Sequence, residues 1–423
     1  MDNKKLTKLE KYWILYDVGN SAFILLVSTI IPIYFNYLAG SAGISEVDYL
    51  AYWGYAASVA TVIVAVIGPI LGSVADTKNY KKPLFVVTMM IGVIGCAALA
   101  VPASWIVFLA VFVIAKVGYN ASLIFYDSML VDVTTGERMD TVSSHGYAWG
   151  YIGSCIPFVI SLVFVLMYES IGISMKAAMA IAFFLNAAWW LLVTVPLLKN
   201  YEQKHYAELP DHPIRGSFRR LGKTLASIKK EKHIFLYLLA FFFFIDGVYT
   251  IIEMATAYGS ALGLDSTGLL LALLVTQIVA FPCALIFSKL SKQYETDVLI
   301  KVCIVAYTGI ALFAIQLDKQ WEFWLLAVLV GMFQGAIQAL SRSYFARIIP
   351  AEKSGEYFGI YDICGKGASF VGTTLVGVVA QLTNAANAGV AIIAVLFVIG
   401  FVLFHKAAVL NRQTLAGRQT GDI

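Results

Sequence analysis

Charged side chains are scarce in this sequence. Aspartate, glutamate, lysine and arginine together make up 13% of the 423 residues, whereas apolar residues make up 60% and the mean hydropathy is +0.80. A soluble globular domain carries about 25% charged residues, so this composition excludes that class. The charges that are present gather between long apolar runs, which indicates an integral membrane protein.

Histidine and cysteine are also few, with five of each. The sequence has no HExxH, no G-x-S-x-G and no GxxxxGK[ST] pattern, which argues against metalloprotease, serine-hydrolase and ATPase chemistry. No cysteines form a C-x-x-C pair and all five fall inside apolar runs, so we expect packing roles, without disulfides or a metal site. We therefore expect neither an enzyme nor a cofactor; a membrane enzyme or sensor on the same scaffold is the alternative.

Twelve apolar runs are each long enough to cross a bilayer, which takes about 20 helical residues. Helices are expected because backbone groups in hydrocarbon need partners within their own segment. The first run is too long for a signal-peptide core and carries Asp17, so we expect it to be retained. The predicted spans are 13–38, 52–75, 83–103, 105–131, 144–168, 177–198, 233–260, 268–290, 298–316, 321–345, 356–382 and 388–409.

Basic residues are distributed unevenly around these spans. Of the 30 lysines and arginines, only Lys176 and Lys319 fall in the loops of one side, and Lys116 and Lys366 lie within spans. Positive charge marks the cytoplasmic side of a membrane protein, so both termini are predicted to be cytoplasmic. The net charge of +4 then reflects topology and does not indicate a nucleic-acid partner.

One long polar stretch, residues 199–232, divides the spans into two sets of six. The expected fold class is all-α, with two pseudo-symmetric six-helix bundles at 1–198 and 233–423 joined by this cytoplasmic linker. Four apolar residues recur at helical spacing in the linker, which predicts a short amphipathic helix on the membrane surface, with a solvated linker as the alternative. These residues are Phe218, Leu221, Leu225 and Ile228.

Polar residues inside the membrane are concentrated in the spans 13–38, 105–131, 233–260, 321–345 and 356–382. At about 100° per residue, those on one helix share a face. Charges in hydrocarbon are costly, so these stripes should face a water-filled pathway or one another. The residues assigned to a substrate or ion pathway are Asp17, Asn20, Lys116, Asn120, Asp246, Glu253, Gln334, Gln338 and Lys366.

A second set of residues is assigned to a conformational gate. In Gly68–Pro83, GPILGSVADTKNYKKP, glycine permits close helix approach, and Asp76 can accept from the N–H groups that begin the span 356–382. An ordinary basic loop is the alternative interpretation of this stretch. The gate residues are Gly72, Asp76, Asp127, Arg342 and Asp362, with a purely structural Asp127–Arg342 lock as the alternative for that pair.

Lys116 has no acidic neighbour three or four residues away, so its partner must come from another helix or from a ligand. Asp246 lies at a similar depth in the other half, and a cation facing an anion across a cavity matches a small zwitterion such as an amino acid. A direct bridge from Lys116 to Asp246 or to Asp17 is the alternative. Asp246 is ranked first as a proton-binding carboxylate, the alternative being that it supports a helix break beside Gly247.

Five stretches carry a family resemblance: Asp17–Phe23, Asn120–Asp132, GYAWGYIG at 146–153, QALSRSYFARIIP at 338–350 and EYFGIYD at 356–362. With the spacing of Gly72 and Asp76, they make the chain resemble the autophagy-related vacuole effluxer family of the major facilitator superfamily. The chain departs from the wider superfamily by lacking an arginine in the middle of the span 105–131, and its second loop has lost the Gly-x-x-x-Asp spacing.

The resemblance implies a twelve-helix major facilitator fold and secondary active efflux of small solutes such as amino acids by alternating access. We further expect a monomer surrounded by lipid in a bacterial inner membrane, with protons as the candidate coupling ion. Because the same fold hosts lipid movers, a lipid flippase or scramblase is the functional alternative.

Overall fold

The computed structural model describes residues 5–101, 104–207, 222–224, 226, 228, 230–261, 266–383 and 386–420. Helices dominate this part of the chain, which confirms the expected all-α class. The long helices of the first half are α1 (Lys8–Ser28), α2 (Ile30–Ser41), α3 (Glu46–Ala75), α4 (Lys81–Ala98), α5 (Trp105–Ser128), α7 (Met139–Leu166) and α9 (Met175–Asn200). Those of the second half are α11 (Lys232–Ala261), α12 (Ser266–Leu290), α13 (Thr296–Ala314), α14 (Gln320–Ile348), α15 (Ser354–Thr383) and α16 (Ala386–Thr420). The described residues also include four short pieces: α6 (Leu130–Val133), α8 (Tyr168–Ile171), η1 (Gly136–Arg138) and η2 (Ala351–Lys353).

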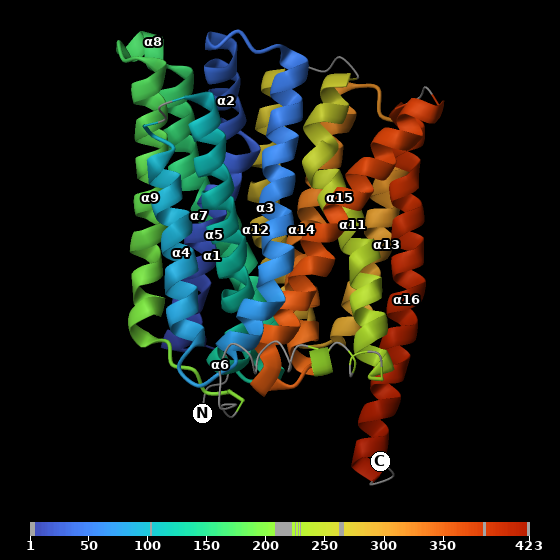
Figure 1. Cartoon of the computed structure of the whole chain (residues 1–423). Coiled ribbons are helices and arrows are strands. Elements are labelled where there is room, and N and C mark those ends of the chain that lie inside the picture. The colour runs from blue at the N-terminus through green and yellow to red at the C-terminus, as the bar shows by residue number, and fades with distance from the viewer. Residues whose placement is uncertain are drawn as a thin grey trace.

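Twelve segments of the described chain are long and apolar enough to cross a membrane. They coincide with the predicted spans to within several residues, because each span is decided by its own local hydropathy. Figure 1 shows α1 to α9 mainly on one side of the molecule and α11 to α16 mainly on the other. We call these the first and the second helix group.

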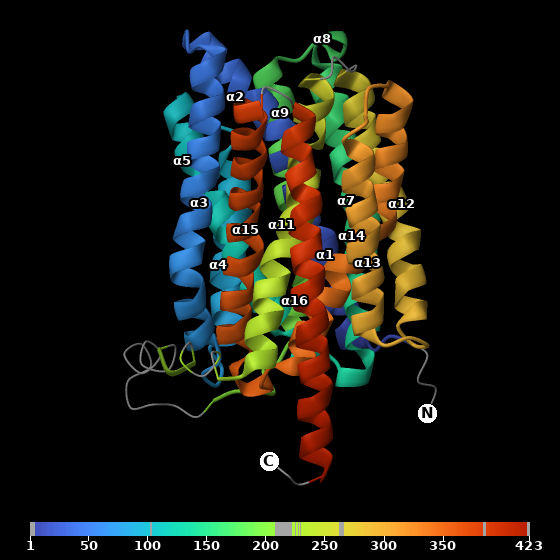
Figure 2. The same ribbon diagram turned by 90° about the vertical axis from the view of Figure 1, so that its right-hand side faces the viewer.

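Helix α1 begins and α16 ends at the same side of the bundle, with α16 projecting beyond its neighbours (Figures 1 and 2). We call this the terminal side and the opposite one the far side. The two groups meet where α3 and α5 pack against α15, and where α7 packs against α12 and α14. These four helix pairs bring together segments that are more than a hundred residues apart.

The first predicted span, 13–38, is divided in the structure at Thr29, which has φ −136° and ψ −73°. Pro32 explains the break, since proline has no N–H to donate to the carbonyl of Ser28 and its ring collides with the preceding turn. The Thr29 hydroxyl donates to the carbonyl of Leu25 at 2.5 Å and satisfies part of the interrupted ladder. Apolar residues stand on both sides of the break, so a hydropathy profile does not reveal it.

Helices α3 and α15 come into backbone contact on the terminal side. A Cβ atom built on Gly72 would lie 2.1 Å from the carbonyl oxygen of Gly355, and one on Gly359 would lie 2.7 Å from the Cα of Pro69. Only glycine fits at such positions, as in other close helix crossings within membranes. The predicted close approach at Gly72 is therefore present, and its partner is the start of α15.

The first part of the linker crosses the terminal side as an extended segment. Residues 201–207 run back past the α3–α4 loop, and Ala207 forms an isolated parallel bridge with Thr77. The predicted amphipathic helix lies largely outside the described residues, since Phe218, Leu221 and Leu225 are not among them. Of its four apolar residues, the described one, Ile228, is 5% exposed.

Candidate functional site

Asp76 ends α3 and meets the beginning of α15. Its carboxylate oxygens accept from the backbone N–H groups of Gly355 at 2.7 Å and Glu356 at 2.9 Å. These amides lie in the first turn of α15, where no intrahelical acceptor exists and the helix dipole favours a negative charge. The contact that the sequence predicts for Asp76 is thus present, and it joins the two helix groups.

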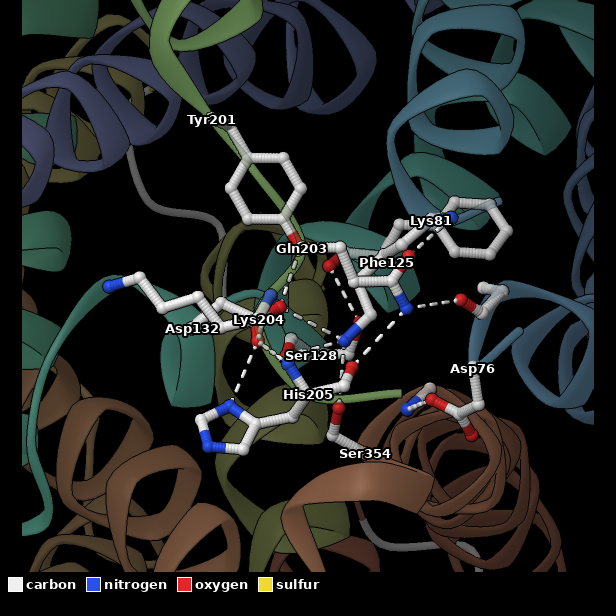
Figure 3. A network of polar contacts seen from close by, with 12 residues as sticks. Asp76, Lys81, Phe125, Ser128, Asp132, Tyr201, Gln203, Lys204, His205 and Ser354 are labelled. Carbon is white, nitrogen blue, oxygen red and sulfur yellow. Dashed lines mark hydrogen bonds and ion pairs between the residues drawn. The ribbon is translucent and has the colours of Figure 1, made fainter. Parts of the chain in front are cut away.

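Lys81 begins α4 and is fully buried, which sequence reasoning missed. Its ammonium lies 3.3 Å from the carboxylate of Asp132, donates to the carbonyl of Ser128 at 3.3 Å, and donates to the hydroxyl of Ser354 at 2.9 Å (Figure 3). Ser354 is the first residue of α15, so Lys81 is a second link between the groups beside Asp76. A lysine in a predicted basic loop gave no signal that it would be buried.

Arg342 on α14 reaches into the first group. It is 2% exposed and lies 2.9 Å from Asp127 on α5 and 3.2 Å from Asp17 on α1. Its Nε donates to the Ser143 hydroxyl at 2.9 Å, and its guanidinium carbon lies 4.6 Å from the centre of the Trp13 ring. Such a fork of donors suits two carboxylates at once. The predicted Asp127–Arg342 pair is present, and the structure adds Asp17 to it.

Asp140, near the start of α7, makes a further link that the sequence did not predict. Its carboxylate accepts from Arg347 at 2.7 Å, from the hydroxyl of Thr296 at 2.5 Å and from that of Ser343. All three donors belong to the second group. Ser343 and Arg347 stand four residues apart on one face of α14, a pattern that could have indicated a partner for them.

Deeper in the molecule, a pair on α15 touches α5. Asp362 and Lys366 lie 2.5 Å apart and are 13% and 24% exposed, and the Lys366 ammonium donates to the carbonyl of Asn120 at 3.3 Å. Lys366 is 12 residues beyond the start of α15, or about 18 Å along its axis. Thus a predicted gate residue, Asp362, and a predicted pathway residue, Lys366, form one pair.

The other pathway residues lie around these contacts. Gln334 and Gln338 on α14 are 5% and 9% exposed, and Gln338 accepts from the hydroxyl of Tyr151 at 3.4 Å. Asn20 donates to Asp17 at 3.4 Å and so supports the Arg342 cluster. The ammonium of Lys116 lies 5.8 Å from the centre of the Phe112 ring, and Asp17, one alternative partner for it, is paired with Arg342.

Asp246 on α11 is buried and bonded within the second group. It is 0% exposed and accepts from the backbone N–H of Gly372 at 3.0 Å and from the Thr250 hydroxyl at 3.3 Å. These contacts place it between α11 and α15 inside the second group. The side chain of Glu253 lies outside the described residues.

Comparison with known proteins identifies the family to which the chain belongs. The family model described as "Vacuole effluxer Atg22 like" matches residues 7–134 and 131–414, which together are most of the chain. The chain belongs to that family.

One relative that covers nearly the whole chain is named as a transporter. The MFS-type transporter YxiO of Bacillus subtilis (strain 168) is 43% identical over 405 residues, covering 95% of each chain. Autophagy-related protein 22-1 of Penicillium rubens is 26% identical over 268 residues, covering 57% of this chain and 45% of the fungal one. The chain is therefore an integral membrane transporter of the MFS type.

Solved structures agree on the fold. FucP, a Major Facilitator Superfamily transporter in the outward conformation, matches with a TM-score of 0.70 at 14% identity, covering 95% of this chain and 97% of FucP. A bacterial homologue of the iron transporter ferroportin matches with a TM-score of 0.69 at 14% identity, covering 95% and 98%. At such identities the likeness establishes the major facilitator fold and nothing about the cargo.

Proposed function

We propose that this effluxer is a secondary transporter that exports small solutes by alternating access, and that the structure is its state closed at the terminal side. The observation that carries the proposal is the row of links between the two groups, made by Asp76, Lys81, Asp140 and Arg342. All are hydrogen bonds or ion pairs between residues of the two groups. A rocking of one group against the other can break them together without unfolding either group.

The terminal side is assigned to the cytoplasm. The basic residues of the loops gather there, including Lys78, Lys81 and Lys82 beside Asp76, while Lys176 and Lys319 lie in far-side loops. The excess of lysine and arginine in short loops determines which side faces the cytoplasm. With this orientation, the closed links seal the inner face of a plasma membrane protein.

We assign proton coupling to the cluster around Arg342. Two carboxylates, Asp17 and Asp127, share one guanidinium, so the cluster carries one excess negative charge in a buried place. Like charges held this close favour a proton on one of them. Asp127 is the more accessible, with 19% of its side chain exposed against 8% for Asp17, and is the proposed proton site.

Protonation of Asp127 would weaken its hold on Arg342 and thereby the closed state. A proton taken up from the far side would then favour opening to the cytoplasm, where the proton leaves and a solute enters. The deprotonated carboxylate pairs again with Arg342 and closes the terminal side. This sequence of events exchanges an inward proton for an outward solute, as export against a gradient requires.

The proposed cargo is a small zwitterion such as an amino acid. Asp362 and Lys366 offer an anion and a cation at mid-depth on one helix, both partly exposed. The carboxylate of a zwitterion can replace Asp362 as the partner of Lys366, while its ammonium pairs with Asp362. Lys366 also donates to the carbonyl of Asn120 in the other group, so cargo bound at Lys366 would change a contact between the two groups.

Counterflow in proteoliposomes tests this function. Vesicles loaded with an unlabelled amino acid mixture should take up labelled amino acid in a saturable way, and Lys366→Gln should abolish the uptake. Lys176→Gln, which removes an exposed lysine on the far side, is the matched control and should transport normally. Unchanged exchange in Lys366→Gln would remove that residue from the cargo site, and lipid movement without solute exchange would support the flippase instead.

A further inference from the structure

The seven residues that follow α9, Tyr201–Ala207, form a segment that we call the linker strap. Its backbone is tied to the α3–α4 loop, because the N–H of Ala207 donates to the carbonyl of Asp76 at 2.8 Å. Its side chains alternate, as in any extended chain: positions 201, 203 and 205 face the protein, whereas 202, 204 and 206 are exposed. The strap therefore has one face built for contact and one that faces solvent.

Asp132 on α6 anchors the inward face of the strap (Figure 3). Its carboxylate accepts from the Tyr201 hydroxyl at 2.6 Å, from the backbone N–H groups of Lys204 at 3.2 Å and His205 at 2.9 Å, and lies 3.0 Å from the His205 ring. Burial and the charge of Asp132 raise the pKa of the Tyr201 phenol well above its ordinary value, so this hydroxyl keeps its proton and donates. Lys81 also donates to this carboxylate, at 3.3 Å.

Gln203 extends these contacts to the backbone around Asp76. Its amide nitrogen donates to the carbonyl of Ala75 at 3.0 Å, and its amide oxygen accepts from the N–H of Lys81 at 3.4 Å. Together with the bond from Ala207, the strap holds the chain at Ala75, Asp76 and Lys81. Two of these three residues make the links to α15 on the terminal side.

We infer that the linker strap is a working part of the terminal-side gate and positions Asp76 and Lys81 for their contacts with α15. The inference rests on the proposed function, since a gate matters only if the two groups separate. A lysine side chain is flexible and loses much rotational freedom when it is held in one place. The strap covers Asp132 and Lys81 so that neither is exposed, and a charge pair away from water is stronger than one at the surface.

If the strap were only a passive tether, cutting its contacts would leave the gate unchanged. Hydrogen exchange distinguishes a tether from a strap that positions Asp76 and Lys81. The N–H groups of Gly355 and Glu356 lie in the first turn of α15 and are protected by Asp76 rather than by their own helix. Their exchange rates, measured by mass spectrometry on the full chain in nanodiscs, therefore report closure of the gate. The assay needs no cargo, so it stays readable even if the proposed transport activity fails.

The test variant is Tyr201→Phe with Gln203→Ala, and its matched control is Glu202→Ala with Lys204→Ala on the exposed face of the strap. The test variant removes the Tyr201 hydroxyl bond and the side-chain bonds of Gln203. We expect it to raise exchange at least about tenfold both in 201–207 and in 354–358, because a net loss equal to one buried hydrogen bond is enough for that change. The control should change neither.

Faster exchange in 201–207 alone, or no change in either segment, would overturn the inference and leave the strap a tether. Tyr201→Phe by itself is measured in parallel. It keeps the buried ring and removes only the hydroxyl that donates to Asp132, so it decides the matter if the double variant folds poorly.

Discussion

Replacing Gly72 with alanine should open the gate on the terminal side. In the closed state the added Cβ would lie 2.1 Å from the carbonyl oxygen of Gly355 and 2.7 Å from its carbonyl carbon. Both are backbone atoms, so no side chain can turn away to make room. The helices α3 and α15 must therefore separate, which also lengthens the 2.7 Å bond from the Gly355 N–H to Asp76.

The size of the effect follows from the contact distance. Non-bonded carbon atoms are most stable at about 3.5–4.0 Å, so relief of the clash requires a shift of more than about 1 Å. Overpacking of this kind costs roughly 1–3 kcal/mol. The cost falls on the closed state, because in the open state the helix ends are apart. A difference of that size moves a two-state equilibrium by about 5- to 150-fold.

Distance measurements between spin labels can detect this shift. Glu137→Cys and Glu352→Cys place labels on exposed terminal-side positions of the first and second group, in a background where Cys283 and Cys364, which are only partly buried, are serine. Gly72→Ala should transfer population to a longer distance. The same distance distribution as the parent, in a protein that melts normally, would refute the reasoning.

Gly54→Ala is the matched control on the same helix. A Cβ at Gly54 meets nothing within 4 Å, so it adds no clash between the groups. Alanine is the better helix former by up to about 1 kcal/mol. This variant should leave the label distances unchanged and melt at the same or a slightly higher temperature.

Three further predictions concern the charge cluster and the topology. Arg342→Gln leaves Asp17 and Asp127 without their guanidinium and should lower the free energy of unfolding by about 3–5 kcal/mol, seen as a lower melting temperature in detergent; unchanged melting would contradict the role of this cluster. Asp127→Asn should abolish uptake driven by a pH gradient while preserving counterflow, and Asp246→Asn should keep both; the reverse result would return the proton site to Asp246. A reporter that is active only outside the cytoplasm, fused after residue 423, should be silent, and activity there would reverse the assigned orientation.

The spans and the fold class could be predicted from the sequence because each depends on local composition. A run of about 20 apolar residues becomes a membrane helix whatever surrounds it. The contact of Asp76 with the start of α15 was also predictable, because a carboxylate, a nearby glycine and a helix N-terminus are each visible in the sequence. The break at Thr29 was missed because the run stays apolar through Pro32, and hydropathy does not measure hydrogen bonding.

Apart from the Asp76 contact and the Asp127–Arg342 pair, the partners of the charged residues were decided by the tertiary structure alone. Asp17 and Arg342 are 325 residues apart, and no spacing within either helix indicates that they meet. Lys81 and Asp132 lie near the ends of predicted spans, where a charged side chain is expected to be exposed to solvent. Both are fully buried in the structure, where the linker strap contacts Asp132 and Lys81. Burial of a charge depends on what covers it, and here the covering segment comes from about 70 to 120 residues further along the chain.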